Sequence, residues 1–213
     1  EDDVEIILGR GGIKPDIHIA VPDNRMPWSG HMALYATDLI YQEIRNHRTT
    51  IVFVNTRAQA ELIFQALWHV NDDNLPIALH HGSLAVEQRR KVEAAMAQGR
   101  LQAVVATSSL DLGIDWGDVD LVMQVGAPKG VSRLLQRIGR ANHRMNEPSK
   151  AILVPANRFE LLECRAAIAA IDHGKLDGTP LQPGGLDVLA QHVVGTACSQ
   201  PFFPDELLSL IHI

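Results

Sequence analysis

The sequence of 213 residues contains only two cysteines, Cys164 and Cys198. Their spacing makes neither a disulfide framework nor a zinc site. Cys164 falls in a helical pattern of apolar residues, so we expect it to be a small core residue. Long apolar runs are also lacking, and none approaches the length that spans a membrane. Because the acidic start, Glu1-Asp2-Asp3, is unlike a signal peptide, we expect a cytoplasmic protein with no membrane partner.

An excess of positive charge is absent as well, since 19 Lys and Arg face 25 Asp and Glu. The net charge of −6 argues against a nucleic-acid binder with a basic coat over its whole surface. The distribution is uneven: residues 1–128 hold ten basic against seventeen acidic residues, and 129–213 hold nine against eight. Residues 129–144 contain five basic residues and no acid, namely Lys129, Arg133, Arg137, Arg140 and Arg144. Such a local strip on an acidic body favours a phosphate site.

Two nucleotide-binding motifs are missing. A phosphate-loop NTPase needs G-x-x-x-x-G-K-[ST] and an acidic residue for magnesium, yet Gly174-Lys175 lacks the preceding glycine and the following hydroxyl. Asp205-Glu206-Leu207-Leu208 differs from D-E-x-H at its last position. The glycines at 9, 11 and 12 precede Ile13-Lys14-Pro15 rather than a helix start, which indicates a turn. The motifs that would bind ATP and its metal ion in such a protein are therefore absent from this sequence.

The apolar share of 46% is sufficient for a buried core, and the charged share of 21% does not suggest disorder. Short apolar runs predict strands at 4–8, 17–21, 51–54, 76–79, 103–106, 121–125 and 151–154. Helical spacing predicts helices at 33–46, after Thr56, from Ser83 to about Gln98, and at 132–142 and 159–173. Strands that alternate with helices predict an α/β fold with a parallel sheet covered by helices on both faces.

A proline- and glycine-rich linker then separates residues 1–175 from a second part, residues 176–213. The helix expected from Leu186 to Ala197 lies outside the sheet pattern. About thirty residues after the linker are too few to close a second core.

The stretch from Ala106 to Arg144 carries the chemistry. Its first loop follows an apolar strand and offers hydroxyls, a glycine and a carboxylate where a parallel sheet would end, the edge at which open α/β sheets bind ligands. Its second loop carries Arg137, Arg140 and Arg144 at spacings of three and four, so we expect one helix face to present all three guanidiniums to phosphate oxygens.

These two loops, Ala106-Thr107-Ser108-Ser109-Leu110-Asp111-Leu112-Gly113-Ile114-Asp115 and Gln136-Arg137-Ile138-Gly139-Arg140-Ala141-Asn142-His143-Arg144, resemble motifs V and VI of superfamily 2 helicases. Ile51-Val52-Phe53-Val54-Asn55-Thr56-Arg57 resembles motif IV, and His80-His81-Gly82-Ser83 with Glu87-Gln88-Arg89-Arg90 resembles the nucleic-acid segment after it. The sequence is similar to that of the large helicase-related group, especially the bacterial ligase-associated DEXH-box helicases. Two segments that carry this similarity are Pro27-Trp28-Ser29-Gly30-His31 and Val154-Pro155-Ala156-Asn157-Arg158-Phe159-Glu160. The resemblance covers nearly the whole chain and implies a second RecA-like domain followed by the start of a winged helix.

The resemblance implies catalytic roles for three motif VI residues. Arg140 would be the arginine finger, a permanently charged fork at the developing γ-phosphate charge. Gln136 could orient water or bond the γ-phosphate. Arg144 or Arg137 could act as a second finger, and Arg137 could instead tie the motif to its own domain. His143 stands where DEAD-box proteins carry a further arginine. The alternative is a solvated basic helix face.

Four residues would contact ATP: Gly113, Asp115, Arg140 and Arg144. A glycine allows close backbone approach, and a carboxylate can accept from a ribose hydroxyl or pair with an arginine across the cleft. An ordinary Gly-Asp turn is the alternative for Gly113 and Asp115.

The same resemblance implies a nucleic-acid track. It comprises Asn55, Arg57, Gly82, Ser83, Arg89, Thr107 and Ser108. These positions follow strand ends or begin helices, where backbone N–H groups attract phosphate without reading sequence. A surface salt bridge is the alternative for Arg57 and Arg89, and a strand-end cap for Thr107.

Other chemistry-bearing residues favour structural interpretations. His80 and His81 are adjacent on a strand and point to opposite faces, so they cannot share a metal ion. Trp28, Trp68 and Trp116 are expected in a core or an interface more than as base-stacking platforms.

The function implied is that of the second motor domain of an ATP-dependent DNA helicase or translocase on single-stranded DNA or a tailed duplex. It would use ATP with Mg²⁺ held by the first RecA-like domain, and act in DNA repair beside a ligase and a nuclease. An RNA helicase of related build and a non-catalytic nucleic-acid-binding domain remain the alternatives.

Overall fold

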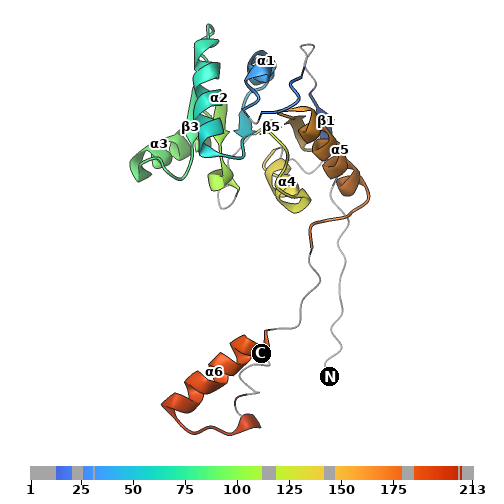
Figure 1. The fold of residues 1–213 in the computed structure, drawn as a ribbon. Coiled ribbons are helices and arrows are strands. Elements are labelled where there is room, and N and C mark those ends of the chain that lie inside the picture. The colour runs from blue at the N-terminus through green and yellow to red at the C-terminus, as the bar shows by residue number, and fades with distance from the viewer. Residues whose placement is uncertain are drawn as a thin grey trace. The chain divides into compact units, whose positions relative to one another are not determined.

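Six strands form one parallel sheet in the order β1-β6-β5-β2-β4-β3 (Figure 1). The computed structural model describes residues 13–20, 26–30, 32–111, 119–141, 147–178, 185–205 and 207. The strands are β1 Asp16–Ile19, β2 Thr50–Phe53, β3 Ile77–His80, β4 Ala103–Ala106, β5 Leu121–Val125 and β6 Lys150–Val154. Since every neighbouring pair is parallel, all six carboxyl ends meet at one edge of the sheet.

The central strands are mostly apolar because both faces of the sheet are covered. Every residue of β2, β4 and β5 is buried. The continuous Val, Ile and Leu runs that predict these strands are what a doubly covered parallel sheet requires.

Two helices cover one face of the sheet. The helices α1 Thr37–Asn46 and α2 Arg57–His69 pack Ile40, Ile44, Ile63 and Leu67 against the sheet. The sheet side chains in this cluster include Val52, Val105 and Met123.

The opposite face carries the helices α3 Val86–Ala97, α4 Val131–Ile138 and α5 Arg158–Asp172. Met96 packs with Phe53 and Val104, and Leu134, Ile138 and Cys164 pack with Ala151 and Leu153. Cys164 is 0% exposed, so the expectation of a small core residue is confirmed, and burial raises the pKa of its thiol to about 12. The expected α/β fold is confirmed too.

Two expected helix boundaries are wrong. The helix after β3 begins at Val86 with Ala85 as its N-cap, so Ser83 lies in the preceding turn and caps nothing. The helix expected to reach Asn142 ends at Ile138, with Gly139 as its C-cap. By contrast, Thr56 caps α2 as predicted, because its hydroxyl accepts a hydrogen bond from the Gln59 N–H at 3.1 Å.

The helix expected over 33–46 begins with a short 3-10 turn, η1 Leu34–Ala36, before α1 starts. The strand expected at 4–8 lies outside the described residues.

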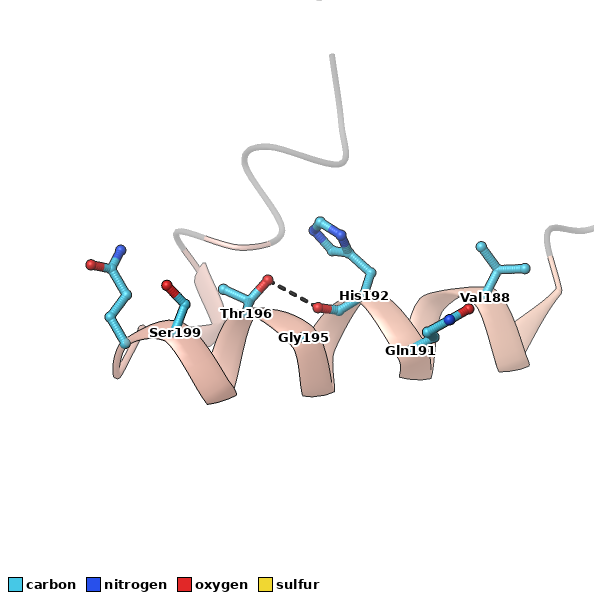
Figure 2. Close-up of a pocket in the computed structure, with 7 residues that line it drawn as sticks. Val188, Gln191, His192, Gly195, Thr196 and Ser199 are labelled. Atoms are coloured by element: carbon cyan, nitrogen blue, oxygen red, sulfur yellow. Dashed lines mark hydrogen bonds between the residues drawn. The ribbon is translucent and has the colours of Figure 1, made fainter.

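The chain divides into two compact units, Glu1–Asp177 and Gly178–Ile213. The second unit contains α6 Leu186–Ser199, none of whose residues is buried. Figure 2 shows an open groove along this helix, where the Thr196 hydroxyl donates to the His192 carbonyl at 2.9 Å. Within the described residues, no helix combines the length and the apolar character that a membrane span requires.

A buried carboxylate fastens the ends of β5 and β6 together. One oxygen of Glu160, in the first turn of α5, accepts hydrogen bonds from the backbone N–H groups of Ala127 at 3.0 Å and Ala156 at 2.9 Å. Asn157 caps the same helix by accepting from the Phe159 and Glu160 N–H groups. Ala127 and Ala156 lie beyond the ends of their strands, so no neighbouring strand accepts from their N–H groups. The Glu160 carboxylate is the acceptor in its place.

We expect Glu160→Ala to lower the free energy of unfolding by about 1–3 kcal/mol per unpaired buried N–H. Urea unfolding of the chain, followed by circular dichroism, measures this loss. Glu163→Ala is the matched control, since Glu163 is exposed on the same helix. Equal denaturation midpoints for the two variants would contradict the role of Glu160.

Candidate functional site

The described site residues gather at the carboxyl edge of the sheet. Asn55 and Arg57 follow β2, Gly82 and Ser83 follow β3, and Thr107 and Ser108 follow β4. Arg89 lies on α3, Gln136 and Arg137 lie on α4, and Arg140 lies in the turn after it. Gly113, Asp115, Arg144 and Trp116 lie outside the described residues.

Asp111 joins the loop after β4 to the helix after β5. Its carboxylate accepts from Arg137, with Nε at 2.8 Å and Nη2 at 3.4 Å, and Arg133 Nε lies 3.6 Å away. Asp111 is 6% exposed and Arg137 is 3% exposed, so water screens this pair little. A forked guanidinium that meets both oxygens of one carboxylate fixes both direction and distance.

Two further partners complete the environment of Arg137. Its Nη1 donates to Gln124 Oε1 at 2.6 Å, and its guanidinium carbon lies 4.7 Å from the centre of the Phe53 ring. Each part of the side chain is therefore satisfied inside the domain. This geometry favours the interpretation that Arg137 ties the motif to its own domain over that of a second finger.

The side chain of Arg140 contacts the backbone of the same loop. Its Nη2 donates to the carbonyl oxygen of Asp111 at 2.6 Å, and the side chain is half-buried. The expectation that one helix face presents all three arginines is wrong for the described pair, because the helix ends at Ile138 and Arg137 points into the interior. Gln136 is exposed on the last turn of α4.

Asn55 holds the end of β2 against the end of β5. Its Nδ2 donates to the Ala127 carbonyl at 2.8 Å, and its backbone N–H donates to Gln59 Oε1 at 3.0 Å. The chain passes so close here that a Cβ on Gly126, which has φ +87°, would lie 2.8 Å from Asn55 Nδ2. Only glycine fits this position without displacing Asn55.

The first turn of α4 is held by a distant aspartate. Asp177 accepts from the Ser132 N–H at 2.9 Å, and Gly130, with φ +126°, leaves room for the carboxylate because a Cβ would lie 2.6 Å from its oxygen. A carboxylate at this helix end also complements the helix dipole. The helix that carries Gln136 and Arg137 thus has its start fixed by the last residue of the first unit.

Arg57 and the nearby His81 both face Glu61 on α2. Arg57 Nε donates to Glu61 Oε1 at 2.8 Å, and His81 Nε2 lies 3.4 Å from the same oxygen. The hydrogen bond from Arg57 is the largest cause that lowers the pKa of Glu61. The alternative of a surface salt bridge therefore describes the contact of Arg57 in this chain, and its contact with nucleic acid stays a prediction.

The remaining predicted contacts lie around the ends of β3 and β4. Gly82, Ser83 and Ser108 are exposed, and Thr107 and Arg89 are half-buried. The Thr107 N–H donates to the His80 carbonyl at 3.3 Å. These residues share one edge, but their contact with phosphate stays a prediction.

The aromatic residues differ from expectation. Trp28 is 63% exposed and Trp68 is 62% exposed, so the expectation of a core position is wrong for both, and the alternative of an interface stays a prediction. Trp28 lies under the guanidinium of Arg158 at 4.3 Å and 6.5 Å from Phe159.

Sequence reasoning missed Asp111, Gln124 and Asp177 as positioning residues. One signal for Gln124 was present, because it is the single polar residue inside an apolar strand run. Nothing in one sequence shows that Asp177 pairs with a helix start 45 positions earlier.

The donors and acceptors at this edge suit recognition of phosphate by a guanidinium, an amide and backbone N–H groups. The described residues hold no group of three or more His, Cys, Asp or Glu that could bind a metal ion.

Comparison with known proteins identifies the family. Residues 34–146 match the family described as helicase conserved C-terminal domain. The ATP-dependent helicase Lhr-Core of Methanothermobacter thermautotrophicus is 41% identical over 184 residues, which cover 84% of this chain and 21% of that protein. The Lhr helicase/probable uracil glycosylase of Mycolicibacterium smegmatis is 34% identical over 229 residues, which cover 89% of this chain and 15% of the relative. The chain thus spans about a quarter of the length of its curated relatives, or less.

Solved structures agree. The Mycobacterium smegmatis helicase Lhr, bound to ssDNA and AMP-PNP, matches with a TM-score of 0.73 and 36% identity over 91% of this chain and 26% of that one. The helicase MrfA bound to DNA shares the fold, with a TM-score of 0.67 at 22% identity over 83% of this chain and 25% of that one. The resemblance to superfamily 2 helicases is confirmed, and, with more than half of its residues matched, the chain belongs to the helicase C-terminal domain family.

Proposed function

We propose that this chain is the second motor domain of an ATP-dependent DNA helicase or translocase that moves on single-stranded DNA. A single observation carries the proposal. At the carboxyl edge of the sheet, Asp111 of the loop after β4 accepts hydrogen bonds from both Arg137 and Arg140. Relatives that are ATP-dependent helicases, and an Lhr structure bound to ssDNA and AMP-PNP, support it. The first RecA-like domain of the same protein would hold ATP and Mg²⁺.

In this mechanism, Arg140 supplies the guanidinium that stabilises the charge developing on the γ-phosphate. A planar fork with permanent charge suits that task. Its hydrogen bond to the Asp111 carbonyl holds the side chain beside the loop after β4. The guanidinium would therefore already be oriented when the two motor domains close around ATP. Gln136, exposed one turn before it, would orient the attacking water or bond the phosphate.

Arg137 acts as a positioning residue in the same proposal. It bridges Asp111 and Gln124 in the interior and keeps α4 in place under the turn that bears Arg140. Gly113, Asp115 and Arg144 would complete the nucleotide contacts.

The track along single-stranded DNA, or the single-stranded tail of a duplex, would comprise Asn55, Arg57, Gly82, Ser83, Arg89, Thr107 and Ser108. Contacts of this kind, made by hydroxyls, backbone N–H groups and arginines, grip phosphate regardless of base. ATP-driven opening and closing of the two motor domains would then alternate the grip and move the protein along the strand.

The biological setting is proposed on the resemblance alone. It comprises DNA repair in the cytoplasm of a bacterium, beside a DNA ligase and a nuclease. Residues 176–213 would be the linker and the start of a winged-helix domain.

The isolated chain should bind or turn over ATP negligibly, because it contains no phosphate loop. Phosphate release by the purified 213 residues, with and without single-stranded DNA, measures this. The full-length protein is the positive control. Robust DNA-stimulated hydrolysis by the chain alone would refute the assignment as one half of a motor.

In the full-length protein, Arg140→Ala should reduce ATP hydrolysis about 10³-fold or more, the range measured for supplied arginine fingers. ATP affinity should change little, since the finger acts mainly on the transition state. The control is Arg165→Ala, which removes the same charge from an exposed position on a different helix, α5. Equal turnover by Arg140→Ala and the parent would remove Arg140 from the mechanism.

Arg137→Ala should instead lower stability. Its loss leaves a buried carboxylate and the Gln124 amide without their partner, a change that costs about 3–5 kcal/mol. Arg140→Ala should cost about 1 kcal/mol, the net value of a hydrogen bond. Urea unfolding of both variants of the chain compares the two losses. A larger loss from Arg140→Ala would show that the positioning role belongs to Arg140.

A further inference from the structure

A buried histidine connects two separate segments of the proposed nucleic-acid track. His80, the last residue of β3, is 1% exposed, and both of its ring nitrogens have partners. Nδ1 lies 2.8 Å from Ser109 Oγ, and Nε2 lies 3.0 Å from Glu93 Oε1. Ser109 belongs to η2 Ser108–Leu110, which follows β4, and Glu93 lies in the middle of α3. We name these three residues the His80 relay.

The positions of the hydrogens follow from the partners. A carboxylate can only accept, so Nε2 carries the hydrogen that points to Glu93. Burial is the largest cause that lowers the pKa of His80, so the ring is neutral at pH 7 and Nδ1 is an acceptor. The Ser109 hydroxyl therefore donates to Nδ1. The His80 carbonyl is a second acceptor for this hydrogen at the longer distance of 3.3 Å.

Each end of the relay adjoins proposed phosphate contacts. Ser109 follows Thr107 and Ser108 directly, and the Thr107 N–H donates to the His80 carbonyl at 3.3 Å. On α3, Glu93 lies one turn after Arg89, on the same side of the helix. One ring thus holds the loop after β4 and the helix after β3 at a fixed separation.

The neighbouring His81 provides a contrast. It is also buried, at 2% exposed, but it faces Glu61 on α2 on the opposite side of the sheet. Among the described residues, neither of its ring nitrogens has a hydrogen-bond partner. The two histidines are adjacent and similarly buried. Only the His80 ring makes hydrogen bonds to two different elements.

We propose that His80 is a positioning residue that holds the 107–109 loop and α3 in the arrangement that grips the nucleic-acid backbone, an inference that rests on the proposed function. A phosphate backbone has a fixed spacing between charges. Contacts from two elements act together only when the elements themselves are held at a matching distance. The buried ring sets that distance while it is itself neutral, and the one charge of the relay, the Glu93 carboxylate, is 29% exposed.

The test measures the affinity of the full-length protein for a fluorescein-labelled single-stranded oligonucleotide by anisotropy. Ser109→Ala and Glu93→Ala should each weaken binding about threefold to tenfold, the equivalent of one net hydrogen bond. The double variant should bind no more weakly than the weaker single variant, because both changes break the same connection. Glu93→Gln should retain most of the affinity, since its amide oxygen still accepts from Nε2.

His80→Phe should match the double variant, and His81→Phe, the matched control, should bind as the parent does. A merely structural histidine would lower the thermal midpoint and leave the affinity of the folded protein unchanged. Losses that multiply in the double variant, or parental affinity in folded His80→Phe, would overturn the proposal. Should His80→Phe fail to fold, the Ser109 and Glu93 variants decide alone.

Thr107→Ala separates the two levels of inference. If it weakens binding while the relay variants do not, the role of His80 is wrong and the proposed track stands. If the parent protein does not bind single-stranded DNA, the proposed function and the relay both fail.

Discussion

The buried ion pair between Asp111 and Arg137 is the interaction on which the site depends. It joins residues 26 positions apart, from a loop and a helix that no strand pairing connects. Burying two charges costs several kcal/mol, and the pair is kept favourable only when geometry and further hydrogen bonds are good. Gln124 accepts a further hydrogen bond from Arg137, and the Phe53 ring adds a cation–π contact. Because Arg140 binds the carbonyl of the same aspartate, the pair that holds α4 also fixes where the proposed finger begins.

The same device recurs along the carboxyl edge. Strand ladders end there, and the backbone groups beyond them need other partners. Glu160 takes two N–H groups, Asn55 donates to the turn after β5, and His80 bridges α3 and the loop after β4. Each is a polar side chain that a sequence reader would sooner place on the surface. Together they tie described segments beyond the strand ends to neighbouring elements, which suits a site that works by positioning.

The sequence predicts the strands and helices well because their signal is local. Apolar runs of four or five residues and the i, i+3, i+4 spacing appear within one element. The helix after β5 was extended too far because its arginine spacing continues past Gly139, where the backbone leaves the helix. Ser83 is a residue type that often caps a helix, but the chain turns there and Ala85 is the N-cap.

The partners of Asp111, Asp177 and His80 could not be predicted, because pairing across tens of residues depends on how the whole sheet assembles. Trp28 and Trp68 are exposed, which residue type alone does not reveal.

The basic strip that first pointed to a phosphate site is partly neutralised within the domain. Arg137 and Arg133 both lie at the carboxylate of Asp111, and Arg57 pairs with Glu61. Counted with these partners, the edge is far less positive than its arginines alone suggest, on a chain whose net charge is −6. A diffuse positive field therefore cannot be what draws a polyanion to this edge. The remaining means are donors set at fixed places, such as backbone N–H groups, hydroxyls and single guanidiniums whose positions are held by acids behind them. In the proposed function, such a surface would recognise the spacing of phosphates more than their total charge, because a protein that advances along a backbone depends on that spacing.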